Sequence, residues 1–194
     1  MKQVAIIDYG AGNVQSVQFA FERLGIQSIV TSDSSKIQSA SHVIFPGVGH
    51  AKAAKSHLVE TGLIEVIKTL NQPVLGICLG MQLLCNQTKE GPTQGLQIFD
   101  TSVVKFDVDL KVPAVGWAPV KSKNHPLFER LENEQFYFVH SYYAQVSDST
   151  IGLADYQISY SAALANKNFL GVQFHPERSG KAGEQLLTNF LKLS

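Results

Sequence analysis

The sequence predicts an α/β fold with three layers, in which a largely parallel, doubly wound sheet carries added antiparallel strands in the second half of the chain. Short apolar runs recur in the first half and alternate with segments of helical spacing, whereas from about Gly95 strand-like runs follow one another with few helices between them. The 194 residues suit a chain with one sizeable core. We therefore expect residues 1–194 to form a single domain.

Four apolar runs in the first half are the expected parallel strands. Their near-continuous apolar character is typical of strands that helices cover on both faces. The runs are VAIID (4–8), SIVTS (28–32), HVIFPG (42–47) and PVLGIC (73–78).

Two helices are expected between these strands. Asn13 is suited to cap the first, which Gly25 would end and whose apolar face is Val14, Val17, Phe21 and Leu24. Apolar residues at helical spacing predict another helix over positions 58–70, namely Leu58, Leu63, Ile64, Ile67 and Leu70.

The second half predicts successive strands and then one closing helix. The strand-like runs are QIFDTSVVKF (97–106), FYFVHSYYAQV (136–146) and YSAALANKNFLGVQFHPE (160–177). The segment 180–193 has apolar residues at Leu186, Leu187, Phe190 and Leu191, as an amphipathic helix requires.

Composition argues against nucleic-acid and membrane partners. Lys+Arg and Asp+Glu both number 16, so the formal net charge is zero. The N-terminus lacks a secretory pattern, and no apolar run approaches the ~18 residues of a membrane span. Cys78 and Cys85 are about two turns apart in one expected helix, too far for a disulfide. We expect reduced thiols in a cytoplasmic protein, with no cofactor and no metal.

Cys78 lies where an expected strand turns into an expected helix. The run Gly76-Ile-Cys-Leu-Gly80 has the spacing of the G-x-S-x-G turn, which presents a nucleophile at the carboxyl edge of an α/β sheet. The glycines remove Cβ atoms that would clash with the turn or with a substrate. The positive end of the following helix favours a thiolate, and the Leu79 N–H would point to a developing oxyanion. From this segment alone, a small core residue and a nucleophile are equally good interpretations of Cys78.

His175 is the candidate base. It follows the strand-like FLGVQF and precedes Pro176 and Glu177. On an extended segment, side chains two residues apart share a face, so Glu177 could accept one ring N–H while the other ring nitrogen reaches the thiol. Each residue alone could be structural, but together with Cys78 they form a potential triad.

A second oxyanion donor could come from PGVG (46–49), which follows another apolar strand and should emerge on the same edge of the sheet. Alone, this motif would be an ordinary turn.

These motifs, in this order, resemble those of the triad (class I) glutamine amidotransferases. The resemblance runs through PGVG, GICLGMQLL, FYFVHSYY and GVQFHPE, and the opening IIDYGAGNVQSVQFAFERLG together with AVGW is similar to the glutaminase subunits of imidazole glycerol phosphate synthases. Such subunits serve histidine biosynthesis. The resemblance implies hydrolysis of glutamine to glutamate and ammonia through a thioester on Cys78.

The resemblance also assigns roles to residues. It implies Cys78 as nucleophile, His175 as general acid and base, and Glu177 as the residue that orients His175. Leu79 and the loop residues Val48 and Gly49 would supply the oxyanion hole, after a rearrangement of the loop. Gln82 and the backbone at Ser141 and Tyr142 would bind the α-amino and α-carboxylate groups of glutamine.

A partner is implied as well. The family pairs this subunit with a (β/α)₈-barrel cyclase in a heterodimer, and ammonia passes through the barrel core because ammonium in water is not nucleophilic. The positions that match cyclase-facing residues are Trp117, Tyr137 and Arg178. Ala114, Ala118 and Arg178 depart from the residues common in the family, which bears on this contact and leaves the triad intact.

Three rival functions remain open at this point. A sister subunit for anthranilate, aminodeoxychorismate or pyridoxal phosphate synthesis would share the chemistry, although DYGAGN (8–13) favours the histidine pathway. A free-standing cysteine hydrolase would need no partner, and the HPE motif argues against it. A silent binding module would not need the complete Cys, His and Glu set.

Overall fold

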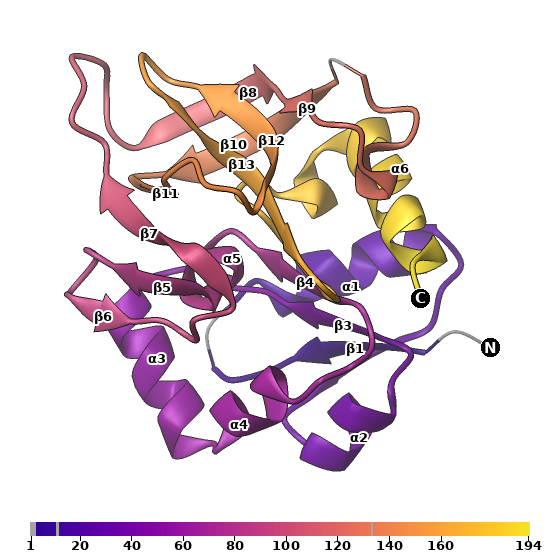
Figure 1. Cartoon of the computed structure of the whole chain (residues 1–194). Coiled ribbons are helices and arrows are strands. Elements are labelled where there is room, and N and C mark those ends of the chain that lie inside the picture. The colour runs from indigo at the N-terminus through magenta and orange to yellow at the C-terminus, as the bar shows by residue number, and fades with distance from the viewer. Residues whose placement is uncertain (1–2, 11, 133) are drawn as a thin grey trace.

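A computed structural model describes residues 3–10, 12–132 and 134–194, and it confirms the α/β fold (Figure 1). The described residues form a 12-stranded mixed sheet and a separate two-stranded sheet. At one end of the large sheet five strands run parallel: the four predicted from the first half and β14 from the second half. In spatial order they are β2 (Ser28–Thr31), β1 (Val4–Ile7), β3 (His42–Phe45), β4 (Val74–Ile77) and β14 (Phe169–Val172).

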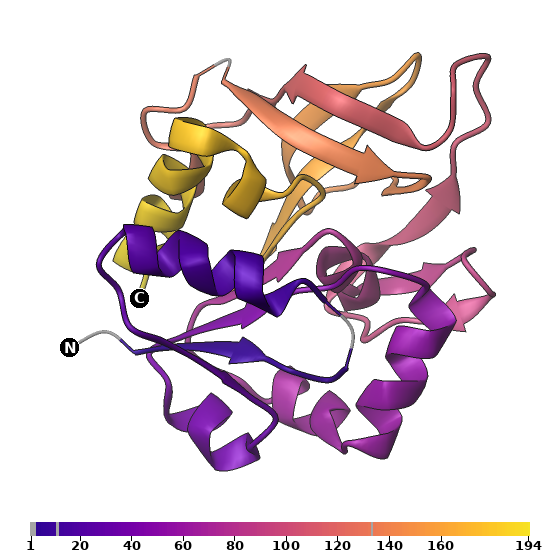
Figure 2. The same ribbon diagram turned by 180° about the vertical axis from the view of Figure 1, so that it is seen from behind.

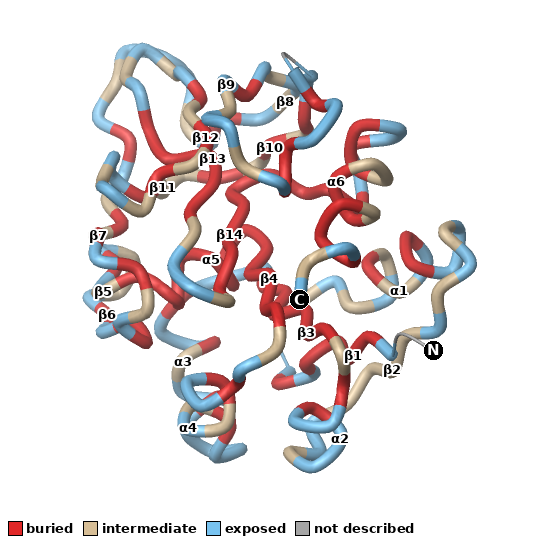
Figure 3. Tube along the Cα trace, turned by 45° about the vertical axis from the view of Figure 1, so that its right-hand side comes forward, coloured by how far each residue is buried: buried red, intermediate tan, exposed pale blue. Residues whose placement is uncertain are grey.

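Helices cover both faces of these parallel strands (Figures 1 and 2). One face carries α1 (Val14–Arg23) and α6 (Gly180–Lys192), and the other carries α2 (Ser34–Ser39), α3 (Ala51–Glu60) and α4 (Leu63–Lys68). Two apolar clusters fill the spaces on the two sides, and the central strands are buried throughout (Figure 3). The three-layer arrangement is therefore confirmed.

Beyond β14 the sheet continues through mostly antiparallel pairs. The neighbours are β13 (Ser159–Asn166), β11 (Tyr142–Ala144) and β7 (Phe99–Lys105), followed by β5 (Cys85–Thr88) and β6 (Thr93–Gln94). Strands β5 and β7 are paired parallel. Strand β12 (Thr150–Asp155) pairs with β13 and also with β9 (Lys121–Ser122). The two-stranded sheet joins β8 (Ala114–Pro119) to β10 (Gln135–His140). Short helices are α5 (Leu79–Leu84), η1 (Pro126–Phe128) and η2 (Pro176–Arg178).

Three predicted elements differ in detail. The helix expected over 58–70 is two helices, α3 and α4, because Gly62 adopts a φ of 67° and breaks the helix between them. The run 136–146 is two strands in different sheets, β10 and β11, separated at Ser141. Helix α5 ends at Leu84, so Cys85 begins a strand instead of continuing the helix, and both cysteines are free.

The predicted N-cap of α1 is confirmed. The Asn13 side chain accepts a hydrogen bond from the Ser16 N–H at 3.3 Å, as an N-cap residue should. Within the described ranges no helix has the length and apolar character that a membrane span would need.

Helix α6 touches the turn η2 without a side chain between them. A Cβ placed on Gly183 would lie 1.9 Å from the Pro176 carbonyl oxygen. Since that oxygen belongs to the backbone, no side-chain rotation could relieve the contact. Gly183 thus sets how closely α6 supports the turn that carries Glu177.

Gly183→Ala is expected to lower the free energy of unfolding by about 1–3 kcal/mol, because the backbones of α6 and η2 must separate. Urea denaturation would measure this change. Gly180→Ala is the matched control, because Gly180 has open space around its Cβ position and a φ of 56°, so it tests backbone strain alone. A Gly183→Ala chain as stable as the wild type would show that this contact is not constrained.

Candidate active site

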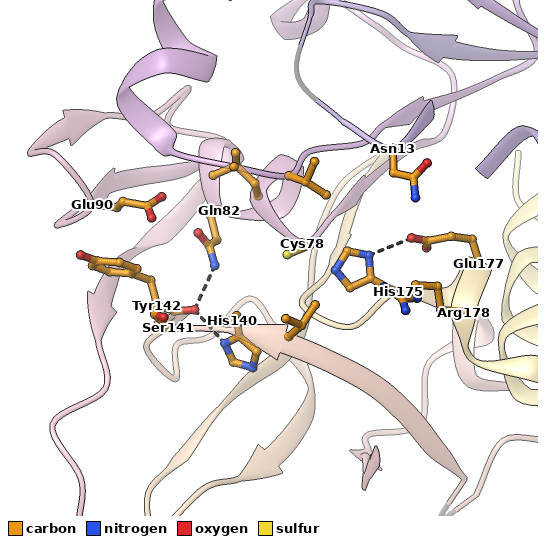
Figure 4. A pocket seen from close by; sticks show the side chains of 14 residues that line it. Asn13, Cys78, Gln82, Glu90, His140, Ser141, Tyr142, His175, Glu177 and Arg178 are labelled. Carbon is orange, nitrogen blue, oxygen red and sulfur yellow. Dashed lines mark hydrogen bonds and ion pairs between the residues drawn. The ribbon is translucent and has the colours of Figure 1, made fainter. Parts of the chain in front are cut away.

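The carboxyl ends of three neighbouring parallel strands meet at one edge of the sheet. Cys78 follows β4, the segment 173–177 follows β14, and the loop 46–49 follows β3. The pairing of Ile77 with Val172 brings the first two segments side by side. A cavity of about 250 Å³ opens at this edge (Figure 4). Its lining includes Val48, Gly49, Cys78, Leu79, Gln82, Ser141, Tyr142, His175, Glu177 and Arg178.

Cys78 lies on a strained turn, as the G-x-C-x-G spacing predicts. Its φ of 52° is unusual for a residue with a side chain. The flanking glycines avoid clashes within the protein. A Cβ on Gly80 would lie 1.9 Å from the Phe45 carbonyl oxygen, and a Cβ on Gly76 would lie 2.9 Å from the Met81 nitrogen. The glycines therefore allow α5 to pack against β3 and β4 beneath the sulfur.

His175 and Glu177 are hydrogen-bonded, although not on an extended segment. The 3₁₀ turn η2 begins at Pro176, and this turn brings Glu177 Oε1 to 2.8 Å from His175 Nδ1. Both side chains are almost fully buried. His175 Nε2 is buried without a hydrogen bond of normal geometry, and Figure 4 shows this edge of the ring turned toward the Cys78 sulfur.

The environment of His175 favours its protonated form. Burial lowers the pKa of the ring, but the interactions with Cys78 and Glu177 outweigh burial and raise the pKa well above its usual value. A sulfur, an imidazole and a carboxylate in series can support nucleophilic attack with a proton held ready for the leaving group.

The Leu79 N–H is engaged in this conformation. It donates to the Gly47 carbonyl oxygen at 3.3 Å, so it is not free to bind an oxyanion. Tyr9, which the sequence analysis did not single out, donates from its hydroxyl to the neighbouring Pro46 carbonyl at 2.9 Å and is buried. Val48 and Gly49 line the cavity beyond this anchored part of the loop.

Gln82 and the segment around Tyr142 are linked. Gln82 Nε2 donates to the Tyr142 carbonyl at 3.0 Å and to Gln173 Oε1 at 2.9 Å. The carbonyl of Ser141 accepts from the Phe106 N–H. The carbonyls of Ser141 and Tyr142 thus both have protein donors. Because both N–H groups of the Gln82 amide have protein acceptors, Gln82 can offer a ligand only its side-chain oxygen.

Trp117, Tyr137 and Arg178 lie against one another on one outer surface, with the two aromatic rings edge to face. Trp117 and Tyr137 face each other across β8 and β10, with ring centroids 6.0 Å apart, and the Arg178 guanidinium lies 4.6 Å from the Tyr137 ring centroid. Trp117 is 54% exposed. We call these three residues the aromatic–arginine stack.

Ala114 and Ala118 lie on the opposite side of β8 from Trp117. Side chains alternate along a strand, and the burial of Ala114 fits an inward position. Both alanines line a second cavity of about 240 Å³, which Trp117 and Tyr160 line as well. These two departures from the family pattern therefore alter the surroundings of Trp117, while the aromatic residues themselves are kept.

Several residues at the cavity were missed by the sequence analysis. Glu90 and His140 line it, and Asn13 lines it besides capping α1. Glu90 Oε2 accepts from the Ala51 N–H at 2.8 Å. No local pattern marks Glu90, whereas His140 stands inside the FYFVHSYY motif that carried the resemblance. Of DYGAGN, Ala11 is outside the described residues.

A metal centre has no ligand set among the residues described. No group of three or more His, Cys, Asp and Glu side chains within residues 3–10, 12–132 and 134–194 could hold an ion.

Iodoacetamide should alkylate Cys78 and spare Cys85 in the folded chain. Cys78 lines the cavity, whereas Cys85 is 0% exposed and burial raises the pKa of its thiol. Intact-mass spectrometry of Cys78→Ala and Cys85→Ala chains would locate the label. A labelled Cys78→Ala chain under native conditions would contradict this assignment.

Comparison with known proteins identifies relatives. The family model Glutamine amidotransferase class-I matches residues 5–193. The imidazole glycerol phosphate synthase subunit HisH of Bacteroides thetaiotaomicron is 50% identical, over 98% of this chain and 100% of that protein, and HisH of Haemophilus influenzae is 47% identical over 99% and 98%. The solved structure of PurLQS from Thermotoga maritima has a TM-score of 0.73 at 17% identity, covers 98% of each chain, and supports the fold alone. With the cysteine turn, the buried His–Glu pair and matches along nearly its whole length, the chain belongs to the class-I glutamine amidotransferase family.

Proposed function

We propose that the chain is the glutaminase subunit of an imidazole glycerol phosphate synthase, with residues 1–194 as one glutaminase domain. The observation that carries the proposal is the series Cys78, His175 and Glu177 at one cavity, with Glu177 Oε1 2.8 Å from His175 Nδ1. The full-length similarity to HisH subunits supports the choice of this enzyme among glutamine amidotransferases.

The chemistry follows from the positions of these groups. The Cys78 sulfur attacks the carbon of the glutamine side-chain amide, and protonated His175 gives its proton to the departing nitrogen, which leaves as ammonia. Water then attacks the thioester while neutral His175 accepts a proton, and glutamate leaves. Glu177 keeps the ring oriented and stabilises its charged form.

The tetrahedral intermediate needs donors that this conformation does not present. The Leu79 N–H must break its hydrogen bond to the Gly47 carbonyl before it can donate to the oxyanion. This change requires the loop 46–49 to move. We propose that Val48 or Gly49 then supplies the second backbone N–H. Gly49, with a φ of 98° and open space around it, suits a loop that changes conformation.

Recognition of glutamine would use the polar wall of the cavity. The α-ammonium group would lie between the Gln82 oxygen, the only polar atom of that amide left for a ligand, and the Glu90 carboxylate. Backbone N–H groups of Ser141 and Tyr142 would bind the α-carboxylate. This placement leaves the side-chain amide directed toward Cys78.

The partner would be a (β/α)₈-barrel cyclase that forms a heterodimer with this chain and receives ammonia through its core. The aromatic–arginine stack borders the cavity, because Arg178 belongs to both. Exposed aromatic and arginine side chains are common anchors of interfaces. Docking there would shield ammonia from water, where it would become ammonium. The two free cysteines suit a reducing compartment, and we assign the activity to the cytoplasm.

Cys78→Ala should lower glutamine-dependent synthesis of imidazole glycerol phosphate by roughly 10³-fold or more, because the thioester cannot form. Ammonia-dependent synthesis by the same complex should remain. The measurement is product formation by the chain co-purified with a cyclase, with glutamine or an ammonium salt as nitrogen source.

Cys85→Ala is the matched control and should keep both activities. Loss of both activities in Cys78→Ala would contradict the role of Cys78. Full glutaminase activity of the isolated chain, unaffected by the cyclase and its nucleotide substrate, would favour a free-standing hydrolase.

The raised pKa of His175 predicts an extended alkaline range. An ordinary histidine loses its proton near pH 6.5, whereas His175 should keep the proton that ammonia needs until the pH rises through its raised pKa. Glu177→Gln removes a group that raises this pKa. The alkaline limb of kcat/KM should therefore move to lower pH, by about one unit or more.

Glu184→Gln is the control, since Glu184 is a surface carboxylate paired with Arg23. It should leave the profile unchanged. An alkaline limb in Glu177→Gln that coincides with that of the wild type would refute the assigned pairing.

A further inference from the structure

Gln173 lies beside the nucleophile but outside the cavity. It follows β14 directly, and the pairing of Val172 with Ile77 places it next to Cys78. Its side chain is 0% exposed, and it is not among the residues that line the cavity. A role for Gln173 must therefore act through its neighbours.

The amide of Gln173 joins two of the residues that we assign to the reaction. Its Nε2 donates to Cys78 Sγ at 3.6 Å, and its Oε1 accepts from Gln82 Nε2 at 2.9 Å. A buried amide that lost either partner would leave an unsatisfied polar group, which costs about 1–3 kcal/mol. Both contacts therefore hold the amide in one orientation.

The orientation of the Gln82 amide is set by the Tyr142 carbonyl, which also contacts His140. Burial lowers the pKa of His140 to about 4, so this ring is neutral at neutral pH. Its Nδ1 lies 2.8 Å from the Tyr142 carbonyl and must donate to it, and its Nε2 can accept from the Tyr160 hydroxyl at 3.3 Å. The Tyr142 carbonyl also accepts from Gln82, which keeps the N–H side of Gln82 away from the substrate.

We propose that Gln173 is a positioning residue for both the nucleophile and Gln82. Its N–H holds the sulfur and stabilises negative charge on it without adding a charge that would change His175. Its oxygen fixes Gln82 so that the Gln82 oxygen faces the α-ammonium group. The second half of this role rests on the proposed function, whereas the contact with the sulfur does not.

Two substitutions separate the two contacts. Gln173→Glu keeps an acceptor for Gln82 and loses the N–H donor to the sulfur. Gln173→Met keeps the approximate length of the side chain and loses both. Gln72→Met is the control, because Gln72 Nε2 donates to the Ile37 and Gln38 carbonyls and lies outside the site.

The first readout is the rate of Cys78 alkylation by iodoacetamide at neutral pH in a Cys85→Ala background, which needs neither glutamine nor a cyclase. Both Gln173 variants should lower this rate by about tenfold or more, since a hydrogen bond that stabilises the reacting thiolate is lost. Gln72→Met should keep the rate of the unsubstituted chain. A folded Gln173→Glu chain that is alkylated at that same rate would overturn the proposal.

The second readout is glutamine hydrolysis by the complex with the cyclase. Gln173→Glu should lower kcat with little change in KM, whereas Gln173→Met should also raise KM because Gln82 is no longer oriented. Equal effects of both variants on KM would refute the link to Gln82. A lowered alkylation rate in the Gln173 variants of a chain that never hydrolyses glutamine would instead refute the proposed function and keep the contact with the sulfur.

A third measurement needs no substitution at Gln173 and tests the proposal even if the variants do not fold. In the unsubstituted chain, the side-chain amide resonance of Gln173 should move when Cys78 is alkylated. An amide resonance that does not move would overturn the proposal.

Discussion

The parallel pairing of β4 with β14 is the constraint on which the site depends. The two strands are far apart in the sequence, yet the Cys78 N–H donates to the Val172 carbonyl at 2.8 Å. The segments that follow the two strands therefore leave the sheet at the same level. Cys78 and His175 then need only short connections to face each other. Without this register, no local conformation of either motif could bring sulfur and imidazole together.

Close packing of backbones turns that register into a definite geometry. Gly80 allows α5 to approach the end of β3, and Gly183 allows α6 to approach η2 from the other face of the sheet. The strain at Cys78 persists because these contacts leave the turn no room to relax. Cys78 and the His–Glu pair are thus each supported by a helix whose contact residue is a glycine.

Local patterns in the sequence were sufficient for the parallel strands β1 to β4 and for marking Cys78 and His175, because each of these elements belongs to or follows a strongly apolar run. They did not mark β5, β6, β8, β9 or β12. They were insufficient where a partner comes from elsewhere in the fold. The proposed roles depend on contacts with groups from other parts of the fold for Glu90, His140 and Gln173. No spacing in the sequence predicts such contacts. The turn at η2 shows the same limit: Glu177 reaches His175 as predicted, but through a 3₁₀ turn that starts at Pro176 and not through strand alternation.

The proposed docking surface and the proposed acid are linked by hydrogen bonds between Tyr137 and the segment around His175. The His175 N–H donates to the Tyr137 carbonyl, the Tyr137 N–H donates to Ser179 Oγ, and that hydroxyl donates to the His175 carbonyl, all within 3.0 Å. Ser179 is buried, so this closed set of hydrogen bonds is shielded from water. A partner that presses on Tyr137 would therefore act on the backbone that holds the imidazole. Cys78 and Gln82 are in turn held through Gln173, which lies two residues before His175. Both halves of the proposed reaction centre therefore depend on the segment that follows β14.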